Sequence, residues 1–232
     1  FATLPLRQDL VLYDAMIHAS VHDGIAAGKA QAIAVPHHQV EAFEREIIRW
    51  RGQGGRGRPW IAVESLYSMD GDRAPLVALA DLAERHDGFL VVDEAHATGV
   101  FGPDGRGLAA ELEGRRNVLA LHTCGKALGL SGALLSLPAV FADYLINRAR
   151  GFIYSTAPSP LMAAAVRESL RMIADEPWRR LRLAELVSVA GEELRRLGIT
   201  PSGSQILPVM IGDNARSLRI APGAGSPPRA SS

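Results

Sequence analysis

The chain has 232 residues, of which 47% are hydrophobic and 22% charged, and its 25 acidic side chains balance its 25 basic ones. This composition predicts a folded α/β protein and excludes intrinsic disorder, while the zero net charge argues against a nucleic-acid partner. A single cysteine, Cys124, excludes an intrachain disulfide framework, and no apolar run reaches the ~20 residues of a membrane span, so we expect a cytoplasmic protein without a membrane partner.

Apolar runs typical of β-strands alternate along the chain with segments of helical period. The predicted strands are LVLYD (10–14), AIAV (32–35), WIAVESLYS (60–68), FLVVDEA (89–95), NVLALHT (117–123), GALLSL (132–137) and FIYST (152–156). The predicted helices are 40–50, a segment that starts at Pro75, 138–149, 159–174 and 176–197. This order predicts a mostly parallel, doubly wound sheet flanked by helices.

The C-terminal part of the chain predicts a change of organisation. We expect residues 1–175 to form a large domain, and 176–220 to form a linker helix and the start of a smaller α/β domain. The first strand of that domain is predicted at QILPVMIGD (205–213). Residues 221–232 are rich in Pro, Gly, Ser and Ala, which predicts a disordered or aberrant tail. Because the chain begins at Phe1 with a sequence typical of the middle of a domain, we predict that it is a fragment.

One lysine stands out in the stretch LHTCGKALG (121–129). Only Lys29 and Lys126 are lysines, whereas the other 23 basic side chains are arginines. A lysine can lose its proton and act as a nucleophile, but an arginine stays charged. Lys126 is therefore either an amine with a chemical role or a solvated charge in a turn.

An acidic residue lies at the end of the preceding predicted strand, as Lys126 lies after the end of its own. Asp93 ends a predicted buried strand, and ligands of open α/β sheets bind beyond the carboxyl ends of the strands. The letters DEAH also occur in helicases, but the chain has no phosphate loop, since Lys126 is followed by Ala127. An acid and a lysine at neighbouring strand ends match a pyridoxal phosphate enzyme, in which the lysine forms a Schiff base and the carboxylate keeps the pyridine nitrogen protonated. A helix cap or a surface acid is the alternative for Asp93.

Three further polar residues follow predicted strands. His96 lies three residues after Asp93, His18 follows the first strand, and Ser68 ends the strand predicted at 60–68. The remaining histidines are predicted to be surface or hydrogen-bonded residues: His22, His37, His38, His86 and His122. The glycine-rich stretch GVFGPDGRG (99–107) lacks dinucleotide spacing and by itself predicts only a loop.

Five stretches together resemble the α-oxoamine synthase family, and within it the 8-amino-7-oxononanoate synthases. They are HASVHDGI, ESLYSMDGDRAPL, VVDEAHATGVFGPDGRGLAAE, HTCGKALGLSGALL and FIYSTAPSP, in the order of the family and within residues 1 to about 220. The block D-E-A-H-x-T-G-V-x-G-x-x-G-R-G is specific to these synthases. The resemblance implies the fold-type I architecture of pyridoxal phosphate transferases, related to the class I and II aminotransferases, in a homodimer.

The resemblance also implies a role for each candidate residue. Lys126 would carry pyridoxal 5'-phosphate as a Schiff base, and Asp93 would pair with its pyridine nitrogen. His96 would bond the phenolic oxygen of the ring, and His18 would stack on the ring face. Lys126, Asp93 and His18 are thus the expected catalytic residues, and no metal is implied.

Three more residues are expected to touch the cofactor. Ser68 would be a polar neighbour of the cofactor, and Thr123 would contact its phosphate. Thr156 would contact the phosphate held by the partner subunit, because the active sites of this family lie at the dimer interface.

The implied reaction is a decarboxylative condensation of L-alanine with pimeloyl-CoA or pimeloyl-acyl-carrier protein, which gives 8-amino-7-oxononanoate in biotin synthesis. Lys126 would remove the α-proton of alanine. Glycine C-acetyltransferase is the alternative within the family, and an aminotransferase or a non-catalytic remnant is a more distant one. Two features of the family have no match here: its upstream phosphate-binding turn and the arginine that holds the substrate carboxylate. We therefore expect this chain, as it stands, to be inactive.

Overall fold

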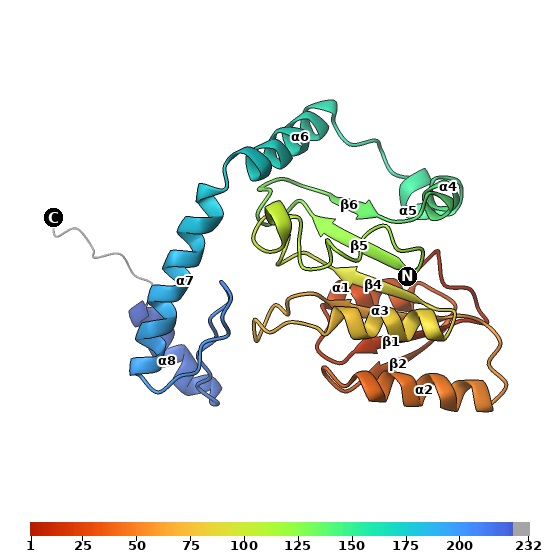
Figure 1. The fold of residues 1–232 in the computed structure, drawn as a ribbon, viewed down its shortest axis with the longest axis horizontal. Coiled ribbons are helices and arrows are strands. Elements are labelled where there is room, and N and C mark those ends of the chain that lie inside the picture. The colour runs from red at the N-terminus through yellow and green to blue at the C-terminus, as the bar shows by residue number, and fades with distance from the viewer. Residues whose placement is uncertain (225–232) are drawn as a thin grey trace.

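The computed structural model describes residues 1–224 and contains a six-stranded sheet with helices on both faces (Figure 1). The strands are β1 (Leu10–Asp14), β2 (Gln31–Val35), β3 (Pro59–Glu64), β4 (Phe89–Asp93), β5 (Val118–Thr123) and β6 (Ala133–Ser136). Their spatial order is β2-β1-β3-β4-β5-β6; β6 pairs antiparallel with β5, and every other pair is parallel. The prediction of a mostly parallel α/β sheet is confirmed.

The helices of the described residues divide between the sheet and the C-terminal part. They are α1 (Ala19–Ala26), α2 (Val40–Gly52), α3 (Leu76–Arg85), α4 (Ala139–Arg148), α5 (Arg150–Ile153), α6 (Pro160–Asp175), α7 (Trp178–Arg196) and α8 (Asn214–Ala224), with a short 3-10 turn at Pro103–Gly105. Figure 1 shows α6 and α7 leading away from the sheet. None of these helices combines the length and apolar character that crossing a bilayer requires.

Two apolar clusters hold the sheet between its helices. Phe43 of α2 and Leu79 of α3 belong to the larger cluster, on the face to which β3 contributes Ile61. The smaller cluster, on the opposite face, contains Trp60 of β3 and is covered in part by Phe141 of α4. Every residue of β3 is buried, because a parallel strand in the middle of a sheet has both faces covered.

Two predicted strands are wrong. The stretch 152–156 is not a strand, because α5 extends to Ile153 and the residues that follow are exposed and irregular. The stretch 205–213 is irregular as well, and Pro208 within it has no N–H to donate to a strand ladder. Helix α8 includes the first four residues of the predicted tail, whereas 225–232 lie outside the described residues.

The segment predicted as the first strand of a second domain contacts loops of the main sheet. A Cβ atom on Gly71 would lie 2.5 Å from the carbonyl oxygen of Ile206, and Ser204 is buried beside it. The side chain of Gln205 donates a 2.7 Å hydrogen bond from Nε2 to the carbonyl oxygen of His96. These contacts connect the C-terminal segment to the loops that follow β3 and β4.

Candidate active site

Polar side chains converge at the carboxyl edge of the parallel strands. One cavity there is lined by His18, Ser20, Glu64, Asp93, Ala95, His96, Leu121, Thr123 and Lys126. The structure therefore brings together five of the seven residues predicted from the sequence: His18, Asp93, His96, Thr123 and Lys126. They come from the loop after β1, the end of β4 and its following loop, and the end of β5 and the connection from it to β6.

Asp93 is fixed at the end of β4 by its own loop. Its Oδ1 accepts the main-chain N–H of Ala95 at 2.9 Å. Burial and the positive charge of Lys126 lower the pKa of His96, while Asp93 acts in the opposite direction. His96 is therefore a neutral imidazole at neutral pH, able to donate or accept a hydrogen bond.

Lys126 lies at the tip of an antiparallel connection rather than before a crossover helix. Main-chain hydrogen bonds close this loop, from Cys124 N to Gly132 O at 2.8 Å and from Leu130 N to Cys124 O at 2.7 Å. The side chain of Lys126 is exposed at the mouth of the cavity. Lys29 is exposed too, but it lies between α1 and β2 and does not line this cavity.

His18 is held as the N-cap residue of α1. Its Nδ1 accepts the main-chain N–H of Ser20 at 3.2 Å and lies 2.8 Å from the Ser20 hydroxyl. This cap satisfies one of the free N–H groups at the start of the helix and fixes the direction of the ring.

Ser68 and Thr156 do not line the cavity. Strand β3 ends at Glu64 rather than at residue 68, so Ser68 lies in the turn beyond the strand. Thr156 lies in an exposed segment after α5, and its expected role toward a partner subunit stays a prediction.

The sequence analysis missed Glu64, a buried acid in the same cavity. It is the last residue of β3, lies opposite Asp93 in the β3–β4 pairing, and is 2% exposed. Burial, followed by the charge of Asp93, raises the pKa of Glu64 to about 7, while the main-chain N–H groups of His18 and Ser68 and the charge of Lys126 oppose that shift. The sequence did contain a signal for this residue, since Glu64 is an acid within an otherwise apolar run. It was missed because the strand was predicted to continue to residue 68, which placed the strand end at the wrong residue.

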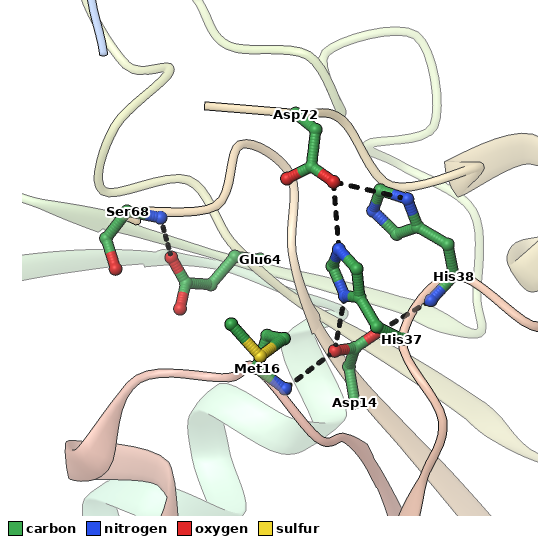
Figure 2. Close-up of polar contacts among 7 residues, drawn as sticks. All are labelled: Asp14, Met16, His37, His38, Glu64, Ser68 and Asp72. Atoms are coloured by element: carbon green, nitrogen blue, oxygen red, sulfur yellow. Dashed lines mark hydrogen bonds and ion pairs between the residues drawn. The ribbon is translucent and has the colours of Figure 1, made fainter. Parts of the chain in front are cut away.

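A histidine-centred cluster lies beside the cavity. Figure 2 shows His37 between two carboxylates, with Nδ1 2.7 Å from Asp14 and Nε2 2.8 Å from Asp72. Burial disfavours the charged ring, but the hydrogen bonds to Asp72 and Asp14 outweigh it and raise the pKa of His37. The main-chain N–H of His38 also donates to Asp14, at 3.0 Å. The prediction that His37 is a hydrogen-bonded residue is confirmed, and the cluster connects the end of β1 to the loops after β2 and β3.

A larger cavity of about 460 Å³ adjoins the lysine cavity. Ser20, Asp93 and Leu121 line both. Most of the other side chains around it are apolar and come from the first residues of the chain, the sheet face and α4.

The comparisons with known proteins agree with this geometry. The family model of the class I and II aminotransferases matches residues 1–221. The 8-amino-7-oxononanoate synthase of Anaeromyxobacter dehalogenans strain 2CP-C is 41% identical over 219 residues, which cover 93% of this chain and 54% of that protein. The chain thus spans about half the length of the curated relatives it matches.

Solved structures show the same fold. Serine palmitoyltransferase from S. paucimobilis, with a bound pyridoxal phosphate–myriocin aldimine, superimposes with a TM-score of 0.84 at 26% identity and covers 93% of this chain and 56% of its own. The 8-amino-7-oxononanoate synthase of Francisella tularensis has a TM-score of 0.78 at 26% identity, over 96% of this chain and 65% of its own. The chain therefore belongs to the class I and II aminotransferase family.

Proposed function

We propose that this chain carries the catalytic lysine of a pyridoxal phosphate-dependent α-oxoamine synthase, which joins an amino acid to an acyl thioester with loss of CO₂. The observation that carries the proposal is the convergence of Lys126, Asp93 and His96 on one cavity. An amine, a carboxylate and a neutral imidazole are the donor set that such a cofactor needs, so the residues present fit it. The names of the relatives from Anaeromyxobacter dehalogenans and Chromobacterium violaceum support the same class.

Each residue has a distinct task in this proposal. Lys126 holds the cofactor through its amine and, once free, takes the α-proton of the amino acid. Asp93 holds the pyridine nitrogen in its protonated form, and His96 binds the phenolic oxygen. When bound, pyridoxal phosphate supplies an electron-poor ring that stabilises negative charge at the α-carbon. His18 excludes water from one face of the ring.

The remaining residues serve the phosphate and the dimer. Thr123 lines the cavity three residues before the lysine and would bind the phosphate. Thr156 is exposed and away from the cavity, which suits a contact with the phosphate held by the second subunit of a homodimer. Ser68 acts through its main-chain N–H, which donates to Glu64.

The lysine assignment is tested by labelling. The chain, completed with the sequence that the Anaeromyxobacter dehalogenans relative has outside the matched region, is incubated with pyridoxal phosphate, reduced with borohydride, and digested for peptide mapping. We expect the pyridoxyl group on Lys126, and Lys29 serves as the internal control because it is the other lysine of this sequence and lies outside the cavity. A label confined to Lys29, or equal labelling of both, would overturn the assignment.

The substrates we propose are L-alanine and a pimeloyl thioester, on CoA or on acyl-carrier protein, with 8-amino-7-oxononanoate as product in biotin synthesis in the cytoplasm. The test is a chimera in which the Anaeromyxobacter dehalogenans relative supplies the sequence outside the matched region. Turnover is measured as thiol release in parallel assays, one with L-alanine and pimeloyl-CoA and one with glycine and acetyl-CoA. Faster turnover of the second pair would favour glycine C-acetyltransferase, and amino transfer to a 2-oxo acid without thiol release would favour an aminotransferase.

A further inference from the structure

Glu64 is a buried carboxyl group of the lysine cavity to which the proposed reaction gives no role. It ends β3 directly opposite Asp93, which ends β4. Because paired residues of neighbouring parallel strands point to the same face, the two carboxyl groups share the face that carries Trp60 and Phe89. Glu64 also lines the cavity that Lys126 lines.

The two oxygens of this carboxyl group have different surroundings. Oε2 accepts the main-chain N–H of Ser68 at 3.2 Å, as Figure 2 shows. Oε1 is buried and accepts no hydrogen bond of regular geometry among the described residues, although the main-chain N–H of His18 is close enough to favour the ionised carboxyl group. A buried polar atom without a partner costs about 1–3 kcal/mol, so a group that binds in the cavity and pairs with Oε1 would be favoured.

The surroundings of Glu64 determine whether its carboxyl group is protonated or ionised. Burial is the largest cause that raises the pKa of Glu64, and the negative charge of Asp93 is the next. Lys126 and the main-chain N–H of His18 act in favour of the ionised form. Two neighbouring carboxyl groups in one partly desolvated cavity resist double ionisation, and Asp93 is the more exposed of the two.

We propose that Glu64, which faces Asp93 across the paired strand ends, carries a proton on Oε1 and donates a hydrogen bond to an acceptor atom of the group bound at Lys126. The proton belongs on Oε1, since Oε2 already accepts from Ser68. The identity of the bound group, pyridoxal phosphate, rests on the proposed function. The protonation of Glu64 is independent of the proposed function.

The binding test compares Glu64→Gln with Glu64→Ala. Glutamine keeps a neutral side chain with a donor and an acceptor, so Glu64→Gln should bind pyridoxal phosphate within about threefold of the wild-type affinity at about pH 6 and more tightly than wild type at about pH 8.5. Glu64→Ala should lose affinity about tenfold at both pH values, as expected for one lost hydrogen bond with its desolvation penalty. Affinity is read from the visible absorbance of the cofactor.

A second measurement needs no cofactor. The pKa of Glu64 in the folded chain, about 7, lies above the ordinary value of 4.5. The folded state therefore binds this proton more tightly than the unfolded state, and wild-type stability should fall as pH rises between these two values. Glu64→Gln lacks this loss, so its stability relative to wild type, from urea unfolding, should increase between about pH 5 and about pH 8.

The outcomes separate this inference from the proposed function. Labelling at Lys126 together with pH-independent affinity of the wild type, or with equal affinities of Glu64→Gln and Glu64→Ala, would overturn the inference and leave the proposed function standing. Failure of the completed wild-type chain to bind pyridoxal phosphate would overturn the proposed function and the ligand contact together. A stability difference that does not change with pH would show that Glu64 is ionised throughout, and would overturn the protonated carboxyl group whatever the cavity binds.

Discussion

A Cβ atom on Gly107 would lie 2.5 Å from Oε2 of Glu94, so the glycine-rich loop and the acid beside Asp93 fit together because residue 107 has no side chain. Glu94 is fully buried, and its carboxylate accepts the main-chain N–H of Leu108 at 3.1 Å and that of Ala109. Neighbouring acids thus have separate tasks: Asp93 lines the lysine cavity, and Glu94 anchors the loop that follows.

Gly107→Ala should destabilise the chain by about 2–4 kcal/mol, because it adds a steric clash to an unfavourable backbone conformation. The φ angle of Gly107 is 105°. The matched control is Gly114→Ala: Gly114 has a φ of 90°, but a Cβ atom there meets nothing within 4 Å. The free energy of unfolding in urea is measured for both variants, and the difference between their losses gives the contribution of the steric contact with Glu94. Equal losses would show that backbone strain alone requires glycine at residue 107.

Glu94→Gln and Asp93→Asn should have opposite effects on stability and on labelling of Lys126. Glu94→Gln replaces one of two accepting oxygens with a donor that faces a main-chain N–H, and it should cost about 2–3 kcal/mol of unfolding free energy. Asp93→Asn keeps an oxygen for the N–H of Ala95 and should cost less than about 1 kcal/mol in the cofactor-free chain. Borohydride labelling of Lys126 should then be weak in Asp93→Asn and retained in Glu94→Gln. Matching stability losses would contradict this division of tasks.

The strands and the residues at their ends were predictable where burial alone determines the structure. Runs such as 89–92 are apolar throughout, and the carboxyl-edge rule then located Asp93 and, after the next strand, Lys126. The same rule failed for the run at 60–68, since the strand ends at Glu64, where the chain turns so that the Ser65 main chain bonds to Asp93. That ending depends on a neighbouring strand distant in sequence, which periodicity does not reveal.

Errors in the C-terminal part have a different cause. The stretch at 152–156 has strand-like composition, but its first two residues continue α5 and the rest does not pair with the sheet, whose edge strand is β6. The contact of Gln205 with the carbonyl of His96 joins residues more than a hundred positions apart, so local pattern carries no signal of it. Composition predicts what a segment can form, and the available partners determine what it does form.

His37→Asn should reduce stability in a pH-dependent way. His37 lies between Asp14 and Asp72, and its folded-state pKa is raised above the ordinary value of 6.5. Its stabilising contribution is therefore complete below the unfolded-state pKa and is lost as pH rises through the higher folded-state pKa. We expect the variant to lose about 1–2 kcal/mol at about pH 6 and less at about pH 9, by urea unfolding.

The control for this measurement is His86→Asn. His86 pairs with Glu44 at 3.0 Å on the surface, where an ion pair contributes little. A loss in His37→Asn that stays constant between the two pH values would show that the ring is neutral and acts by packing against Tyr67 alone.

His96 should report the charges of the cavity directly. Its pKa is lowered by burial first and then by the positive charge of Lys126, while Asp93 opposes the shift. Lys126→Ala removes the repelling charge and should raise the titration midpoint of His96, whereas Asp93→Asn removes the attracting charge and should lower it. The measurement is a pH titration of the histidine ring signals by NMR, with His86 as the internal reference because neither substitution lies near it. Midpoints that move in the same direction in both variants would mean that Lys126 and Asp93 do not act on His96 with opposite charges. The claim that these three side chains share one cavity would then be wrong.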